Sequence, residues 1–208
     1  MIELPSHVPL FPLPNVVLFP QMPVALHVFE PRYRKMVADV RSGENALIGL
    51  VLLRPGWEPV YDGRPPIFPV GCAGRIEQLE ALPDGRSNLV LRGLTRFTVV
   101  GETTGRPYRI GRVQARPERP GEATALEALR ARLIATMERA TRQAVVVLDG
   151  QLPPETLINA LSQSLELAAI ERQSLLDCDT VLDRGQRLLE ILEWKRLEGR
   201  SGGHSRVH

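Results

Sequence analysis

The stretch HVFEPRYR, residues 27–34, packs a histidine, a glutamate, two arginines and a tyrosine into eight positions. His27 and Glu30 are of the types that exchange protons in general acid–base catalysis. The nearby Arg32 and Arg34 are of the type that steadies an anion. A catalytic site here would therefore move a proton on an anionic substrate. The alternative is a corner of the fold that is built from polar side chains.

The local pattern favours the corner. The preceding VALHVF, residues 24–29, is typical of a strand, and Pro31 suits the first position of a helix because its fixed φ is helical and its missing N–H is not needed there. A Glu30 carboxylate at that helix end contributes about 0.3–1 kcal/mol. Arg34 is one turn into the helix, close enough to pair with Glu30. We predict a structural corner of His27, Glu30, Pro31 and Arg34, with no catalytic residue.

The sequence contains no other motif that points to catalysis. It has no GxxxxGK[ST] phosphate loop, no GxGxxG after a strand, no HExxH and no nucleophile elbow. Outside the C-terminal tail only His7 and His27 could serve a Ser-His-Asp triad. Cys72 and Cys178 are too isolated for a disulfide framework or a metal site, and Cys72 reads as a small buried hydrophobe. We therefore predict a protein that is not an enzyme and binds no metal or cofactor.

The sequence pattern of the first half of the chain predicts strands with one inserted helix. Prolines interrupt the apolar runs at 8–13, 16–19 and 24–29, and because proline donates no backbone hydrogen bond we expect edge or bulged strands there. An apolar stripe then predicts a helix that ends near residue 43. Its members are Tyr33, Met36, Val37 and Val40. Further strands are expected at 46–53, 69–82, 88–100 and 107–118, with a Pro-Asp-Gly hairpin turn at 83–87.

Residues 54–68, RPGWEPVYDGRPPIF, form the longest irregular stretch. Loops of more than about 12–15 residues in compact domains are often functional. Trp57, Tyr61 and Phe68 lie in this loop, where exposed aromatic side chains could grip an unfolded peptide. The alternative is that these rings fold back as a lid over the sheet. We take the three aromatics as candidate peptide-binding residues.

The pattern changes to helical periodicity after Pro120-Gly121. Apolar residues from Leu126 to Val147 recur at spacings of three and four, which predicts a long amphipathic helix. Further helices are expected from Pro154, over about 171–176 and over about 180–197. The predicted organisation is a β-rich subdomain over 1–118, a helical bundle over 119–198 and a disordered tail over 199–208. The fold class is α+β.

Three segments together resemble one known family. PLFPLPNVVLFPQMPVALHVFEPRYRKMV (9–37) resembles the opening of the Lon protease N-terminal domain, VGCAGRIEQLEALPDGRSNLVLRGLTRFTVV (70–100) resembles its second signature, and PYRIGRVQ (107–114) its third. The resemblance covers nearly the whole chain. It implies a PUA-like β-barrel subdomain followed by a helical subdomain. It also implies recognition of unfolded or tagged substrate proteins, in a stand-alone member without the ATPase and peptidase domains of full-length Lon.

A PUA-like fold raises RNA binding as the alternative function. Arg92, Arg96, Arg109 and Arg112 could share an outer face of the last strands. No aromatic platform is interleaved with them, however, and the net charge is only +2. We therefore expect a solvated face with cross-strand ion pairs, for example with Glu102.

The resulting expectation is a non-catalytic peptide-recognition module, consistent with an adaptor role in proteolysis or quality control. Its partners would be unfolded segments, a protease or a chaperone, and the sequence argues against nucleic acid. No apolar run reaches the 18 residues of a membrane span and no secretory signal opens the chain, so a cytoplasmic location is expected. The oligomeric state and the identity of the partner stay open.

Overall fold

A computed structural model describes residues 4–43, 46–140 and 152–201. Its contacts divide the chain into two compact units, Met1–Pro117 with Gln163–Asp177 and Glu118–Ser162 with Cys178–His208. The expected boundary at residue 118 lies next to the first of these divisions. The expected helical subdomain over 119–198 differs from them, because residues 163–177 group with the strands of the first unit.

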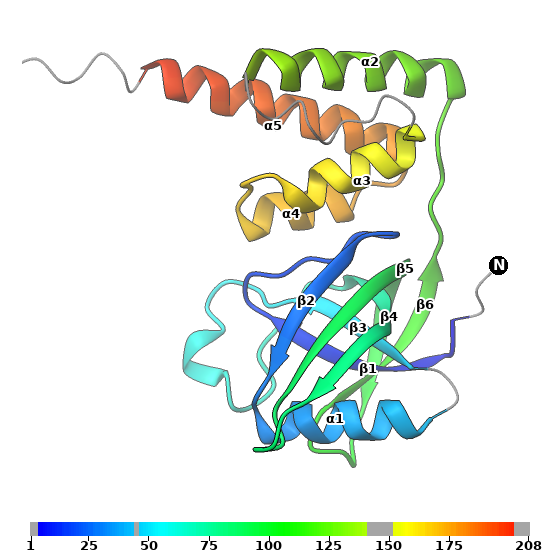
Figure 1. Ribbon diagram of the computed structural model, residues 1–208, viewed down its shortest axis with the longest axis vertical. Coiled ribbons are helices and arrows are strands. Elements are labelled where there is room, and N and C mark those ends of the chain that lie inside the picture. The colour runs from blue at the N-terminus through cyan, green and yellow to red at the C-terminus, as the bar shows by residue number, and fades with distance from the viewer. Residues whose placement is uncertain (1–3, 44–45, 141–151, 202–208) are drawn as a thin grey trace, which may run out of the picture. The chain divides into compact units, whose positions relative to one another are not determined.

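The first unit is built on a six-stranded mixed sheet (Figure 1). Its strands are β1 (His7–Leu13), β2 (Pro23–Val28), β3 (Leu47–Leu52), β4 (Val70–Ala81), β5 (Ser87–Thr103) and β6 (Arg109–Arg116). They are hydrogen-bonded in the order β2-β5-β4-β3-β1-β6, and β5 also pairs with β6. Only β1 and β3 are parallel. Together with the helices this sheet makes the chain an α+β protein.

The prolines place only one of the two N-terminal strands at an edge. β2 pairs with β5 alone, as expected, whereas β1 lies between β3 and β6. The edge prediction was therefore wrong for β1. The physical reason is that the two halves of β1 have different partners, since His7–Leu10 pair with β6 and Leu10–Leu13 pair with β3. Each proline of β1 thus faces one pairing partner rather than two.

Two glycines of the sheet allow neighbouring backbone segments to approach closely. A Cβ atom on Gly93 would lie 2.1 Å from the Phe19 carbonyl oxygen, and one on Gly71 would lie 2.4 Å from the Leu50 carbonyl oxygen. Any side chain at either position would therefore displace backbone. The Pro-Asp-Gly turn joins β4 to β5 as predicted, with Gly85 at a φ of +80°. Asp84 accepts the Arg86 N–H there at 3.0 Å.

The helix predicted after the corner is confirmed as α1 (Pro31–Ser42). Pro31 occupies its first turn, and the predicted apolar stripe is its buried face, made of Tyr33, Met36, Val37 and Val40. These side chains join a core that also contains Phe11, Leu50, Leu91 and the fully buried Cys72. A second buried cluster of the same unit surrounds Phe97.

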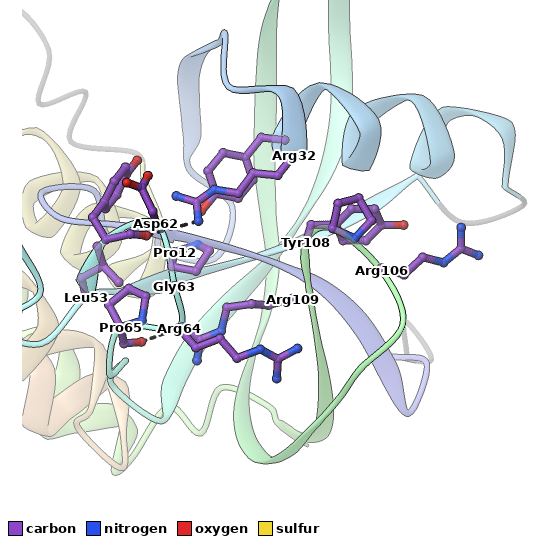
Figure 2. Close-up of a pocket in the computed structure, with 13 residues that line it drawn as sticks. Pro12, Arg32, Leu53, Asp62, Gly63, Arg64, Pro65, Arg106, Tyr108 and Arg109 are labelled. Atoms are coloured by element: carbon purple, nitrogen blue, oxygen red, sulfur yellow. Dashed lines mark hydrogen bonds between the residues drawn. The ribbon is translucent and has the colours of Figure 1, made fainter. Parts of the chain in front are cut away.

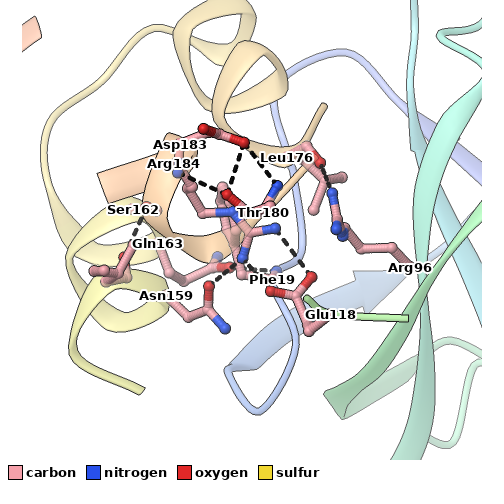
Figure 3. A network of polar contacts seen from close by, with 11 residues as sticks. Phe19, Arg96, Glu118, Asn159, Ser162, Gln163, Leu176, Thr180, Asp183 and Arg184 are labelled. Carbon is pink, nitrogen blue, oxygen red and sulfur yellow. Dashed lines mark hydrogen bonds and ion pairs between the residues drawn. The ribbon is translucent and has the colours of Figure 1, made fainter. Parts of the chain in front are cut away.

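The second helix of the first unit is α4 (Ala169–Leu176). Gln173 donates to the Val70 carbonyl at 3.1 Å. At the end of the helix, Arg96 donates to the Leu176 carbonyl at 2.8 Å (Figure 3). Arg116 donates to the Asp177 carbonyl, also at 2.8 Å. Cations are favourable there because the last carbonyls of a helix have no partners within it. These bonds explain why α4 groups with the sheet.

The second unit contains α2 (Ala123–Ala140), most of α3 (Pro154–Ser164) and α5 (Val181–Ser201). α2 and α5 pack side by side (Figure 1). Gly185 permits the close approach of α5, because a Cβ atom there would lie 2.6 Å from Leu129 and 2.8 Å from Ile158. Thr180 and Asp183 cap α5 reciprocally: the Asp183 N–H donates to the Thr180 hydroxyl at 3.0 Å, and the Thr180 N–H donates to the Asp183 carboxylate at 3.1 Å.

The predicted ends of two helices fall at the limits of the described residues. The part of the long helix expected between 141 and Val147 lies outside them, as does most of the expected tail. α5 continues through Ser201, so helix replaces the first three residues of that tail. Across the described ranges, no helix is long and apolar enough to cross a membrane.

Candidate functional site

The loop over residues 54–68, here called the 54–68 loop, is closed at its base by the backbone. Leu53 and Ile67 form an isolated bridge, the Arg54 N–H donates to Pro66 at 2.9 Å, and the Phe68 N–H donates to Leu52 at 2.9 Å. One short 3₁₀ helix, η1 (Glu58–Val60), interrupts it. The loop therefore starts and ends beside β3, and backbone hydrogen bonds hold its two ends together.

The tip of this loop is fastened to the predicted corner. The Tyr61 hydroxyl donates to one oxygen of Glu30, and Arg32 donates to the other oxygen at 2.9 Å. Arg32 also donates to the Tyr61 carbonyl at 3.2 Å, and its guanidinium lies 4.8 Å from the Tyr33 ring centroid and 4.9 Å from that of Tyr61. The corner and the loop, which the sequence presents as separate features, are joined through one carboxylate.

The expected pairing of Glu30 with Arg34 is wrong, because Arg32 takes that place. Two residues on from Glu30, Arg32 reaches back across the first turn of α1, whereas the Arg34 guanidinium lies against Gly85 in the β4–β5 turn. His27 is on the exposed side of β2, where its Nδ1 lies 2.7 Å from the Asn88 side-chain oxygen. Pro31 occupies its expected position.

Burial sets the charge states in this corner. It raises the pKa of Tyr33 to about 12, so the phenol is neutral at physiological pH. The pKa of Tyr61 is also raised, first by burial and then by its hydrogen bond to Glu30. Burial lowers the pKa of Arg32, but Tyr33, Glu30 and Tyr61 together outweigh it and the net shift is upward. Arg32 is therefore a permanent cation between two neutral rings.

An apolar hollow of about 140 Å³ lies at the base of the 54–68 loop. We call it the apolar hollow, and its lining is formed by Pro14, Leu52, Leu53, Pro55, Trp57, Phe68, Ala169 and Ile170. Two of the three predicted aromatics, Trp57 and Phe68, line it. Ile170 is 50% exposed although it is a large aliphatic residue. Sequence reasoning missed Ile170, because only the fold brings α4 to a loop more than 100 positions earlier.

Tyr61 lines a different hollow, of about 100 Å³, here called the arginine hollow (Figure 2). Its charged lining consists of Arg32, Arg64, Arg106, Arg109 and Asp62, and Leu53 lies in the lining of both hollows. Arg32 is on one side, while Arg64 and Arg109 lie together on another. The Trp57 and Tyr61 rings pack edge to face, with their centroids 5.2 Å apart. The predicted aromatic group is therefore divided between two neighbouring hollows.

The expected outer face of arginines is broken at Arg96. This side chain is completely buried, which corrects the alternation read from the sequence. The correction has two causes: register shifts in the β4–β5 pairing change which side of the sheet a residue faces, and α4 covers this part of the sheet. Arg92 pairs with Glu77 at 2.5 Å. The expected cross-strand ion pairing with Glu102 is confirmed, and Arg109 makes it.

The structure does not bring the histidines and acids considered for catalysis into one group. Among the described residues there is no group of three His, Cys, Asp or Glu that could hold a metal ion. Among the side-chain hydrogen bonds of the described residues, His7 makes one, in which its Nδ1 lies 3.0 Å from the hydroxyl of the neighbouring Ser6. His27 and Glu30 belong to different hydrogen-bonded groups. The fold and these surfaces define an α+β module with an apolar and a cationic hollow beside one tied loop.

Comparisons with known proteins identify the family. The family model described as the ATP-dependent protease La (LON) substrate-binding domain matches residues 7–193, and the chain belongs to this family. Lon protease 2 of Sorangium cellulosum is 29% identical over 91% of the chain, and Lon protease of Chloroflexus aurantiacus is 31% identical over 93%. The chain spans about a quarter of the length of these relatives, 26% and 24% respectively.

Solved structures agree with this assignment. A Lon N-terminal domain protein from Xanthomonas campestris is 27% identical, with a TM-score of 0.58 over 91% of this chain and 98% of that one. The N-terminal domain of the Mycobacterium avium complex Lon protease reaches a TM-score of 0.68 at 17% identity, over 90% of this chain and 98% of that one. The second likeness concerns the fold alone.

Proposed function

We propose that this protein is a non-catalytic module that recognises exposed apolar segments of unfolded proteins. The observation that carries the proposal is the apolar hollow, where Trp57 and Phe68 meet the exposed Ile170 in a chain of the Lon substrate-binding family. Aromatic side chains offer a large contact area with few rotatable bonds, so they lose little entropy when a ligand binds. An aliphatic or aromatic side chain of the bound segment fills the hollow.

The test uses intrinsic fluorescence. The chain has two tryptophans, Trp57 and Trp194, so Trp194→Phe leaves Trp57 as the only reporter. Titration with a reduced, alkylated and therefore unfolded protein is expected to change its emission, whereas the same protein in its folded state is not. Equal responses to the folded and unfolded forms contradict the proposal.

A pair of variants locates the binding surface. Trp57→Ala with Phe68→Ala is expected to weaken binding of a labelled unfolded protein by roughly tenfold or more, the effect of losing about 1.4 kcal/mol. The matched control is Phe29→Ala, because Phe29 is an aromatic residue of the same unit that is 59% exposed and lies outside the hollow. Unchanged affinity in the double variant, or equal loss in the control, removes the hollow as the binding surface.

RNA binding is the weaker alternative. It needs a continuous cationic face, but Arg96 is buried and Arg92 and Arg109 are held in ion pairs. RNA binding that weakens steeply with added salt would reinstate it.

The pairing of β5 with β6, in addition to the sheet order, supports a closed PUA-like barrel as the finer description of the fold.

The setting of this function is also a proposal. An adaptor would deliver bound segments to a separate protease or chaperone, a role that the chain's membership of the substrate-binding family supports. The chain has only two cysteines, Cys72 and Cys178, and therefore no framework of several disulfides. A domain that folds without such a framework suits a reducing compartment such as the cytoplasm. Affinity capture with the intact protein and with the Trp57→Ala, Phe68→Ala variant tests the adaptor role, which fails if both retain the same proteins.

A further inference from the structure

The arginine hollow is lined by arginines whose acidic partners lie outside the lining. Four arginines and one acid, Asp62, are in its lining. The acids that hold the arginines are Glu30, Glu102 and Asp39, and none of these three lines the hollow. Arg32 and Arg109, which pair closely with these acids, are pre-organised, so a ligand need not immobilise them.

Two of these arginines share a single carboxylate. Arg109 binds Glu102 through two nitrogens, with Nε at 2.8 Å, and also donates to the Pro65 carbonyl at 2.6 Å. Arg64 lies 3.8 Å from the same carboxylate, which is an ion pair but is too long for a hydrogen bond. Its other contact, to the Thr103 carbonyl, is 3.4 Å long, and its side chain is 47% exposed. Arg64 therefore keeps donors for another acceptor, beside a second guanidinium (Figure 2).

The two hollows are neighbours. Leu53 lines both of them, and the 54–68 loop contributes Trp57 and Phe68 to one and Tyr61 and Arg64 to the other. An extended segment with an apolar side chain in the apolar hollow thus has its next residues beside the arginines. The volume of about 100 Å³ suits a small planar anion such as a carboxylate.

We propose that the arginine hollow binds a carboxylate of the segment whose apolar side chain fills the apolar hollow, with Arg64 as the principal donor and Arg109 beside it. The recognised segment is then an apolar residue followed closely by an acidic one. This inference rests on the proposed function, and it adds a charge requirement to the recognition. Asp62 at the same hollow opposes the incoming anion and limits its affinity.

Labelled peptides test the charge requirement. Each peptide carries one leucine and, at spacings that increase by one residue, either a glutamate or a glutamine, and its C-terminus is amidated. At the best spacing the glutamate peptide is expected to bind roughly 3–10-fold more tightly than its glutamine counterpart, by fluorescence anisotropy. A glutamine peptide with a free C-terminal carboxylate separates the two sources of the anion. Its tighter binding assigns the site to a chain terminus, and tighter binding of the glutamate peptide assigns it to a side chain.

Three variants tie the preference to the hollow. Arg64→Gln is expected to abolish the preference for glutamate, and Asp62→Asn is expected to increase the preference. Arg112→Gln is the matched control, because Arg112 is an exposed arginine of β6 outside the lining. Circular dichroism verifies that each variant is folded.

The outcomes separate this inference from the proposed function. If both peptides bind the unaltered protein equally and the Trp57→Ala, Phe68→Ala variant loses both, the proposed function stands and the charge requirement is overturned. A preference that persists in Arg64→Gln also overturns it. If neither peptide binds while the unfolded protein does, the segment class is wrong. If nothing unfolded binds, the proposed function itself fails.

Discussion

Two Glu–Arg pairs, one in each unit, have similar parts and different surroundings. In the first unit Glu30 binds Arg32 and the neutral Tyr61 hydroxyl, with about a fifth of each charged side chain exposed. In the second unit Glu118 binds Arg184 at 2.7 and 3.0 Å, and the neutral Asn159 also bonds to Arg184, which is completely buried (Figure 3). The two networks are of the same kind, and their different burial gives them different roles.

The buried network has a structural task. Removing the partner of a buried cation lowers the free energy of unfolding far more than removing that of an exposed one. Through Arg184, Glu118 therefore holds the start of the second unit to α5, and Asn159 holds α3 to it. The partly exposed network can instead hold a surface loop without locking it, since water screens part of the interaction. It fastens the tip of the 54–68 loop between the two hollows.

The largest effect is expected for Arg184→Met. This change leaves the Glu118 carboxylate and the Asn159 amide without the guanidinium that satisfies them, and the free energy of unfolding should fall by about 3–5 kcal/mol. Arg187→Met is the control on the same helix, because its pair with Glu190 is exposed and should contribute less than about 1 kcal/mol. Urea unfolding measures both. Similar losses in the two variants would contradict the contrast between buried and exposed pairs.

Glu30→Ala is expected to have an intermediate effect. It removes the acceptor of both Arg32 and Tyr61, and the free energy of unfolding should fall by about 1–2 kcal/mol. Glu58→Ala, in η1 of the same loop, is the exposed control with an expected change within about 0.5 kcal/mol. If Glu30→Ala leaves thermal stability unchanged but abolishes binding of the unfolded protein, Glu30 belongs to the binding surface rather than to a structural corner.

Tyr61→Phe is expected to have a smaller effect, because it removes one hydroxyl and keeps the ring. The free energy of unfolding should fall by about 0.5–1.5 kcal/mol. Combined with Glu30→Ala it should add almost nothing, since the partner is already gone, and this double-mutant cycle measures the coupling between loop and corner. Full additivity of the two changes would show that the Glu30–Tyr61 contact contributes nothing to stability.

The smallest effect at neutral pH is expected for Tyr33→Phe, whose consequence appears only in alkali. The pKa of Tyr33 is about 12 in the fold against an ordinary 10.0, so the unfolded chain releases this proton first. The stabilisation by the neutral phenol is therefore complete below pH 10 and lost as the pH rises towards 12. Across that range the free energy of unfolding should fall less steeply with pH in Tyr33→Phe than in the unaltered protein. Identical slopes would mean that Tyr33 ionises as in the unfolded chain.

Local features were read correctly where neighbours in sequence are also neighbours in space. The stripe of Tyr33, Met36, Val37 and Val40 predicted the buried face of α1, because helical spacing alone puts these side chains together. The turn at Asp84 and Gly85 was predicted for the same reason. The errors arose where a distant segment intervenes. Arg96 was expected in solvent, but α4 covers it from some 80 positions later.

The candidate site shows the same division. Trp57, Tyr61 and Phe68 were found from the length and composition of one loop. Their separation into two hollows depends on where the fold places Ile170, Arg109 and the corner. The exchange of Arg34 for Arg32 as the partner of Glu30 follows from side-chain direction in a single helical turn, which spacing alone does not resolve.

The sequence by itself determined the family, the strand and helix periodicities, the position of the corner and the loop that carries the aromatics, because each depends on residues close together in the chain. Only the tertiary structure decided which arginines are buried, which carboxylates hold the others, and that an apolar and a cationic hollow share Leu53. The physical reason is that burial and ion pairing depend on what covers a side chain, and here the covering segments come from distant parts of the chain.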